Sequence, residues 1–414
     1  MTETPLPGAT EPEYSVTDAL DIDYYSLFTQ IPEADRELWE RAREVGTGLQ
    51  ERMAAAWDAH EYPLEAVAAL GAADLFVDGL EHPLLSEMSP LGAGLVNMEL
   101  SRIDGSLGTI VAVQGGLALR SLILHGSPEQ QQRWAKPLAS GEVFGAFALT
   151  EPDHGSDSAQ LETVAERTAE GWTLRGAKKW IGNGAAGGIS FVWARVVDDS
   201  VPEGVPGATG SVRCFLIPQE TLGYRAEVIK GKGALRAIDQ ALIRLEDVKV
   251  PADAVLPGST SFRDASRVLY ATRSGVAWSA LGHATGCFES ALSYAKQRRQ
   301  FGKPLAEHQL VQERLTRMLS MLTSMQLYCS QLAASEAGGH LRPTQASLAK
   351  YHNTRTARAI AAEARDLMGG NGILIDNGVM RHLADIEAIH TYEGTESVQA
   401  LLIGRDLTGF SAFA

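Results

Sequence analysis

Cysteine is scarce in this sequence, and basic residues are fewer than acidic ones. The 414 residues include three cysteines, Cys214, Cys287 and Cys329, with no C-x-x-C spacing. Neither a disulfide framework nor a cysteine-built zinc site is therefore indicated. Lys and Arg number 36 against 51 Asp and Glu, which gives a formal net charge of −15. This balance argues against nucleic-acid binding, which usually requires a basic surface.

A leader-like start and a long hydrophobic run are also missing. Residues 1–13 contain no basic segment and no apolar core, and the C-terminus lacks a Ser-Lys-Leu ending. The most apolar stretch, residues 105–119, lies between Asp104 and Arg120. It is short for a membrane span, so we expect a buried helix. We therefore expect a soluble, cytoplasmic protein without membrane insertion.

Several common catalytic motifs are absent. The sequence has no GxGxxG after a strand, no GxxxxGK[ST], no HExxH and no GxSxG. A nicotinamide-binding Rossmann fold, a P-loop and a nucleophile elbow are therefore unsupported. The ten histidines are scattered, and we predict no metal site.

The first of three zones has helical periodicity. Apolar residues recur with the spacing of one helix face at Leu38, Ala42, Val45 and Leu49. Ser127 before Pro128 is typical of a helix N-terminus. We expect an all-α N-terminal domain over residues 1–145.

The second zone consists of short β-rich runs separated by turn residues. Residues 163–168 and 172–175 flank Ala169-Glu170-Gly171 and predict a hairpin. Further runs cover residues 189–196, 212–217 and 241–245, with a Gly-, Pro- and Asp-rich stretch at 198–210. Because no helices intervene, we expect an antiparallel, β-barrel-like middle domain over residues 146–255.

Long helices are predicted in the third zone. A 4-3-4-3 spacing of apolar residues runs through Val311, Leu315, Met318, Leu322, Met325, Cys329 and Leu332. This seam is typical of helices packed nearly parallel. Pro343 begins another helix, which Gly369-Gly370 ends. We expect a C-terminal four-helix bundle over residues 256–414 and an α+β protein overall.

Four segments combine glycine with polar or aromatic residues. They are residues 147–157, residues 178–184, residues 298–304 with Gln309, and residues 366–372 with 391–395. Taken singly, each has an ordinary explanation as a connection, a core Trp, helix-ending arginines or a solvated Glu. Each could also bind a ligand's polar edge, a ring or a phosphate, or supply Glu393 as a general base.

Together, the segments LTEPDHGSD, KKWIGN, RRQFGKPL and MGGNG…TYEGT resemble the acyl-CoA dehydrogenase family of flavoproteins, over about residues 35–413. The nearest likeness is to the glutaryl-CoA dehydrogenase branch, through Arg381-His382, residues 391–395, residues 401–405 and the ending TGFSAF. A second likeness, to the plant peroxisomal short-chain acyl-CoA oxidase, rests on residues 180–183 and 256–264.

The resemblance implies FAD-dependent oxidation of a short- or medium-chain acyl-CoA to the trans-2-enoyl-CoA. Glu393 would remove the α-proton, and the β-hydrogen would leave as hydride to flavin N5. The Glu393 backbone N–H and a flavin ribityl hydroxyl would hold the thioester oxygen.

The resemblance also implies the binding residues. FAD contacts would come from Phe147, Leu149, Thr150, Gly155, Ser156, Trp180, Ile181, Gly182, Arg298, Gln300, Phe301, Gln309, Asp366, Leu367, Met368, Gly369, Gly370, Thr395 and Phe413. Substrate contacts would come from Ser156, Gly108, Thr109, Leu269, Tyr270, Arg273, Tyr392 and Gly394. Arg298 and Gln309 would reach the FAD of a neighbouring subunit, which implies a homo-oligomer, usually a tetramer. An electron-transfer flavoprotein or a similar acceptor would take up the electrons.

Two positions depart from the family pattern. Glutaryl-specific members carry, in place of Gly108, an Arg that holds the distal carboxylate, so we expect glutaryl-CoA to be a poor substrate. Gly108, Gly115 and Gly116 either line the acyl pocket or serve helix packing. Gly182 replaces a Thr or Ser, which would open space beside the flavin. An acyl-CoA oxidase is therefore the alternative, and a catalytically silent scaffold is a third possibility that Glu393 disfavours.

Overall fold

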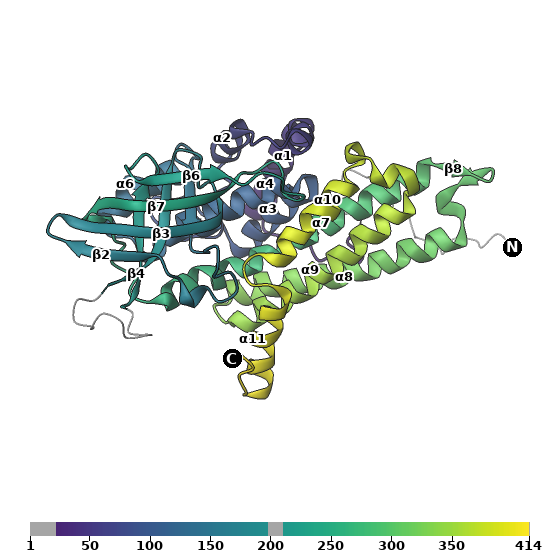
Figure 1. Ribbon diagram of the computed structural model, residues 1–414. Coiled ribbons are helices and arrows are strands. Elements are labelled where there is room, and N and C mark those ends of the chain that lie inside the picture. Colours follow the sequence, from purple (N-terminus) through teal and green to yellow (C-terminus); the bar gives the residue numbers. More distant parts are fainter. Residues whose placement is uncertain (1–21, 198–209, 414) are drawn as a thin grey trace.

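The computed structural model describes residues 22–197 and 210–413 (Figure 1). Helices occupy both ends of the chain and strands its middle, as the periodicity predicts. The predicted boundary at residues 145–146 falls at the start of the first strand, and the one at residues 255–256 falls between the last long strand and the longest helix. Most of the turn-rich stretch at 198–210 lies outside the described residues.

The N-terminal part is helical. Its helices are α1 (Glu33–Ala59), α2 (Leu64–Ala72), α3 (Pro90–Ile103), α4 (Gly105–Val111), α5 (Arg120–His125) and α6 (Pro128–Ala139), with a π-helical segment at Ala112–Leu119. The predicted face of α1 packs inward, since Leu38 and Ala42 are buried and Val45 and Leu49 half-buried. Ser127 caps α6 through a capping box, which confirms the predicted helix start.

The apolar stretch of the sequence forms a longer helix than expected. α4, the π-helical segment and α5 are continuous over Gly105–His125, which is 21 residues. In the described part of the chain this helix alone is long and apolar enough to cross a membrane. Most of it is buried among other elements, which confirms the prediction of a buried helix. The length estimate was wrong because Arg120 continues the helix while pairing with Asp78.

The middle part is one curled, seven-stranded sheet. Its strands are β1 (Gly145–Ala148), β2 (Val164–Thr168), β3 (Gly171–Gly182), β4 (Ile189–Val196), β5 (Val212–Pro218), β6 (Tyr224–Val228) and β7 (Gln240–Pro251). The order is β1-β4-β2-β3-β7-β6, with β5 also on β4. The predicted β2–β3 hairpin is confirmed.

The sheet is mixed, so the prediction of an antiparallel domain is wrong for part of it. β1 and β2 both run parallel to β4, whereas the remaining pairs are antiparallel. The expectation assumed that each strand pairs with its neighbour in sequence through a short turn. β1 follows α6 instead, and β3 and β4 are consecutive in sequence but do not pair, because β2 lies between them in the sheet. Tight turns therefore do not fix the direction of these pairs.

The C-terminal part is a bundle of long helices. It contains α7 (Phe262–Gln297), α8 (Gln309–Ala337), α9 (Pro343–Leu367), α10 (Val379–Thr391) and α11 (Glu396–Thr408), with a small ribbon of β8 (Arg299–Gln300) and β9 (Lys303–Pro304). In Figure 1, α7 to α10 lie side by side and extend away from the sheet, while α11 projects from them. The central part of the predicted α8 seam is buried. Gly369 follows α9 with a φ of 56°, as a helix-ending glycine should.

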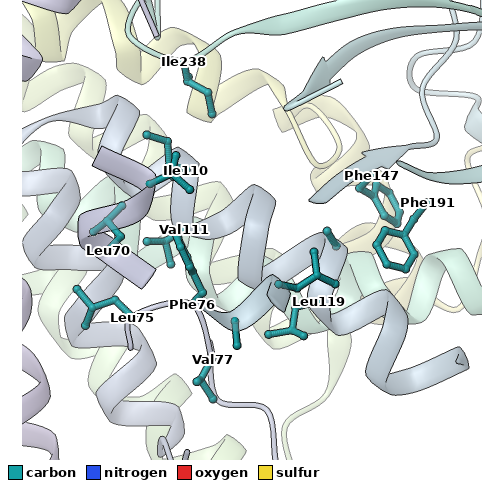
Figure 2. Close-up of a cluster of buried hydrophobic side chains, with 14 of the residues drawn as sticks. Leu70, Leu75, Phe76, Val77, Ile110, Val111, Leu119, Phe147, Phe191 and Ile238 are labelled. Atoms are coloured by element: carbon teal, nitrogen blue, oxygen red, sulfur yellow. The ribbon is translucent and has the colours of Figure 1, made fainter. Parts of the chain in front are cut away.

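One apolar core joins the N-terminal helices to the sheet. Figure 2 shows Ile110, Val111 and Leu119 of the long buried helix on one side of this core, and Phe147 of β1 and Phe191 of β4 on the other. This packing places the ends of β1 and β3 beside the π-helical segment. Phe147 and Gly182, which belong to the two ligand-binding segments predicted in the sheet, therefore lie beside the long buried helix.

Candidate active site

Glu393 lies between α10 and α11, with a left-handed φ of 51°. Its side chain is half-buried, and the Thr272 hydroxyl of α7 donates a hydrogen bond of 2.8 Å to Oε2. Burial raises the pKa of Glu393, while the charges of Lys350 and Arg273 and the Thr272 hydrogen bond oppose that rise. The carboxylate is therefore a stronger base than a solvated Glu.

Buried side chains bind the backbone on both sides of this carboxylate. Lys350 of α9 is 1% exposed, and its Nζ donates to the carbonyl oxygens of Tyr392 and Gly394. Gln399 of α11 donates from Nε2 to the carbonyls of Glu393, at 3.0 Å, and Gly394, at 3.1 Å. Three consecutive carbonyls thus point into the protein. Neither Lys350 nor Gln399 is among the residues predicted from the sequence.

A narrow cavity adjoins Glu393. It is lined by Asp78, Asn97, Ala112, Gly116, Thr272, Gly275, Val276, Ser279 and Tyr392. Part of its lining is polar, since Asp78 pairs with Arg120 at 3.0 Å and accepts a hydrogen bond of 3.2 Å from Asn97. The cavity measures about 10 Å³, so even a short acyl group requires side chains around it to move.

The three glycines of the buried helix have different roles. A Cβ on Gly108 would lie 2.0 Å from Ser101 Oγ, and one on Gly115 would lie 2.1 Å from the Phe76 carbonyl oxygen. These two glycines therefore serve helix packing. Gly116 lines the cavity, where a Cβ would lie 2.9 Å from Asp78 Oδ2.

Most of the other predicted substrate residues lie around Glu393 and the cavity beside it. The Tyr392 hydroxyl lies close to Thr109 and Ser279. The buried Arg273 guanidinium stacks over the Tyr270 ring and donates a hydrogen bond of 3.0 Å to the Ser347 hydroxyl oxygen. The structure therefore groups Thr109, Tyr270, Arg273, Tyr392 and Gly394 near Glu393. Leu269 is half-buried on α7, beside Tyr270. Ser156 lies in an exposed loop of the middle part.

The first two motif segments are joined by a buried ion pair. Lys178 Nζ lies 2.8 Å from Glu151 Oε1, and both side chains are buried. The Glu151 carboxylate also accepts hydrogen bonds from the backbone N–H groups of Glu162 and Thr163. This anchor fixes the loop after β1 against β3. Neither residue was predicted, although both stand inside the quoted motifs.

The predicted flavin-ring residues divide into buried and exposed groups. Trp180 is 54% exposed and is held at a φ of 65° beside a register shift in β3. Gly155 and Ser156 are also exposed, and Thr150 is half-buried. Phe147, Leu149, Ile181 and Gly182 are buried. Phe147 points into the core toward Phe191 (Figure 2), so it can face a ligand only through its backbone.

The space expected beside Gly182 is filled. A Cβ at this position would lie 2.8 Å from Val113 Cγ2 of the π-helical segment. The expectation that glycine opens a gap here was therefore wrong, because a neighbouring side chain occupies it.

Four further predicted FAD residues lie at the far end of the bundle. Arg298, Gln300, Phe301 and Gln309 surround the β8–β9 ribbon, which Figure 1 places at the end opposite the sheet. All four are exposed, Phe301 at 94%. Trp180 belongs to β3, which lies in the sheet, away from these four residues (Figure 1).

A groove between α8 and α9 lies beside this group. It measures about 540 Å³ and is lined by Leu310, Glu313, Arg314, Arg317, Ala359, Ala362, Glu363 and Asp366. Asp366 is exposed and pairs with Arg314 at 2.7 Å. Added Cβ atoms on Gly369 and Gly370 would meet nothing within 4 Å, which leaves open backbone for a ligand. Leu367 and Met368 are buried, Thr395 caps α11, and Phe413 is 41% exposed.

Comparison with known proteins covers almost the whole described chain. Residues 32–142, 146–248 and 262–408 match the models of the N-terminal, middle and C-terminal domains of acyl-CoA dehydrogenases. The human mitochondrial short-chain specific acyl-CoA dehydrogenase is 30% identical over 382 residues, 91% of each chain.

Solved structures agree with this match. A glutaryl-CoA dehydrogenase from Mycobacterium smegmatis has a TM-score of 0.89 and 36% identity, over 96% of this chain and 99% of that one. The structure of a glutaryl-CoA dehydrogenase from the same organism in complex with FADH2 is 34% identical, with the same coverage. A chain described as an electron transferring flavoprotein of Acidaminococcus fermentans has a TM-score of 0.84 and 26% identity, over 92% of this chain and 99% of that one.

Proposed function

The chain belongs to the acyl-CoA dehydrogenase family of FAD-dependent oxidoreductases acting on CH–CH bonds, and we propose that it oxidises short-chain acyl-CoA thioesters to trans-2-enoyl-CoA. The observation that carries this proposal is the half-buried Glu393 carboxylate beside a narrow cavity. Its raised pKa suits a group that must accept a carbon-bound proton.

Each residue of the site has a distinct task. Glu393 accepts the α-proton, and the Thr272 hydroxyl holds one carboxylate oxygen so that the other is free. No described residue accepts a hydrogen bond from the Glu393 backbone N–H, which leaves it available for the thioester oxygen. Bound FAD supplies the acceptor for the β-hydrogen, which leaves with its electron pair as hydride. Trp180 and the loop at residues 150–156 would hold the flavin ring.

A panel of acyl-CoA thioesters tests the proposal directly. The purified, FAD-loaded protein is assayed with a dye acceptor, and the enoyl-CoA product is identified by mass spectrometry. Enoyl-CoA formation from butyryl-CoA supports the proposal. A colourless protein that takes up no FAD and turns over no thioester would instead support the silent scaffold.

The polar part of the cavity lining, at Asp78, predicts a preference for short chains. Additional methylenes would press on the Asp78–Arg120 pair, where apolar groups replace water without forming hydrogen bonds. We expect kcat/KM for butyryl-CoA to exceed that for octanoyl-CoA by at least about 100-fold. Equal values would show that the pocket extends elsewhere. Glutaryl-CoA should be poor, because an Arg at position 108 is absent and would clash with Ser101.

A glycine substitution narrows the same pocket further. Gly116→Ala places a Cβ 2.9 Å from Asp78 Oδ2 and 3.3 Å from Thr272 Cγ2. We expect its kcat/KM for butyryl-CoA to fall about tenfold, an effect of roughly one methylene group. Gly48→Ala is the matched control, since its Cβ meets nothing within 4 Å. Unchanged kinetics in Gly116→Ala would remove Gly116 from the pocket.

An acyl-CoA oxidase is the competing function. The sequence favoured an oxidase because Gly182 was expected to leave space beside the flavin, but Val113 occupies that space. This favours the dehydrogenase. Peroxide release during turnover with oxygen as the only acceptor would reverse the choice.

We further propose that the protein is a homo-oligomer, the tetramer usual in the family, with FAD bound between subunits. The separation of Trp180 from Arg298 and Gln309 supports it, and sedimentation of the holoenzyme tests it.

An electron-transfer flavoprotein is the proposed acceptor, supported by the structural similarity to the Acidaminococcus chain. A cytoplasmic location stays a prediction, which cell fractionation would test.

A further inference from the structure

The peptide group between Tyr392 and Glu393 carries two distinct contacts. Its carbonyl oxygen accepts a hydrogen bond from the Lys350 ammonium. Its N–H, which belongs to Glu393, donates to no described residue. In a trans peptide the C=O and N–H bonds point in opposite directions, and the described chain contains no cis peptide. The free N–H therefore points away from Lys350.

We propose that Lys350 is a positioning residue that polarises the Tyr392–Glu393 peptide group, so that the Glu393 N–H binds the developing negative charge on a thioester oxygen more strongly. This inference rests on the proposed function. A cation on the carbonyl oxygen withdraws electron density from the amide and strengthens its N–H as a donor, as in a chain of hydrogen bonds. The effect grows as charge develops on the substrate.

The geometry favours this role over a purely structural one. An ammonium group costs several kcal/mol to bury, and Lys350 has no carboxylate within 4 Å among the described ion pairs. Its Nζ donates hydrogen bonds to the carbonyls of Tyr392 and Gly394, which flank the base. Gln399 already binds the Glu393 and Gly394 carbonyls without a charge. A second, charged donor therefore adds electrostatics to a loop that is already held.

Lys350 also acts on the carboxylate itself. In its protonated form, Lys350 lowers the pKa of Glu393, as does Arg273 of α7, whereas Asp78 raises that pKa. Burial lowers the pKa of Lys350 itself to about 7, Arg273 lowers it further, and the Glu393 carboxylate opposes that fall. Removal of the ammonium should consequently raise the pKa of Glu393. The acid limb of the kcat/KM profile should then move to higher pH.

The test uses the FAD-loaded enzyme and three variants. Lys350→Met removes the charge, Lys350→Arg keeps it, and Gln399→Met removes two uncharged donors from the same loop. The readout besides turnover is the binding of an acyl-CoA analogue with sulfur in place of the β-methylene. Its α-proton can be removed, but it has no β-hydrogen to transfer, so its deprotonation on the enzyme is followed by absorbance against pH.

For Lys350→Met we expect kcat to fall about 10–100-fold with KM within threefold, part of the loss seen when an oxyanion donor is deleted. Deprotonation of the bound analogue should require a pH about one unit higher. Lys350→Arg should recover most of both values. Gln399→Met should change KM and stability more than the analogue's acidity.

Two results would overturn the inference. One is a folded Lys350→Met variant with FAD bound that deprotonates the analogue at the wild-type pH. The other, decisive if Lys350→Met does not fold, is a folded Lys350→Arg variant that has lost analogue deprotonation. If the wild-type enzyme does not deprotonate the analogue at all, the proposed function fails instead.

Discussion

Glu393→Gln should dehydrogenate acyl-CoA about 10²–10⁴-fold more slowly than the wild-type enzyme, which is the usual contribution of a positioned base. The amide has nearly the same shape and can still accept the Thr272 hydrogen bond at its oxygen. Binding of FAD and of acyl-CoA should therefore change little. Rapid-mixing measurement of flavin bleaching by butyryl-CoA gives the rate, and calorimetry gives the affinity.

A neighbouring carboxylate provides the control. Glu396 starts α11 and pairs with His390 at 2.9 Å and with Arg355. Glu396→Gln removes the same charge three positions away, but not from the cavity. Its rate should stay within about threefold of wild type, as for an ordinary surface pair. A Glu393→Gln variant as active as Glu396→Gln would rule out Glu393 as the base.

Local patterns predicted the zones of the fold well. The hairpin at β2 and β3, the capping box at Ser127 and the seam of α8 all follow from residues close together in sequence. The direction of β1 and β2 against β4 could not be predicted in this way, because no short turn links those strands.

The site could be predicted only in part, for a similar reason. The motif segments identify Glu393 and Trp180, but the partners of Glu393 come from distant helices. Lys350 lies on α9, and its short stretch of sequence is typical of any amphipathic helix. Likewise, glycine alone does not reveal its neighbours, so the space beside Gly182 and the contact of Gly108 with Ser101 required coordinates.

Replacing a buried carboxylate where the N-terminal, middle and C-terminal parts meet should strongly change the stability of the protein. Asp385 of α10 is 0% exposed, and its Oδ1 accepts hydrogen bonds from Trp57 Nε1 of α1 at 2.9 Å and from the Leu235 N–H, between β6 and β7, at 2.6 Å. Burial raises the pKa of Asp385, the nearby Asp104 raises it further, and Arg381 opposes the rise. One side chain thus links helices at both ends of the chain to the sheet.

Asp385→Ala and Asp385→Asn should therefore differ in stability. Asp385→Ala leaves two buried N–H donors unpaired, at a cost of about 1–3 kcal/mol each. Its free energy of unfolding should therefore be about 2–6 kcal/mol lower than that of Asp385→Asn, which keeps the acceptor oxygen. Because the folded pKa is raised, the wild-type contribution is fully present below about pH 4 and is lost as pH rises through the folded pKa. Asn cannot ionise, so it should flatten this decline and gain on wild type at neutral pH. Thermal unfolding from pH 4 to 8 measures all three proteins, and equal Ala and Asn curves would show that Asp385 does not link the parts.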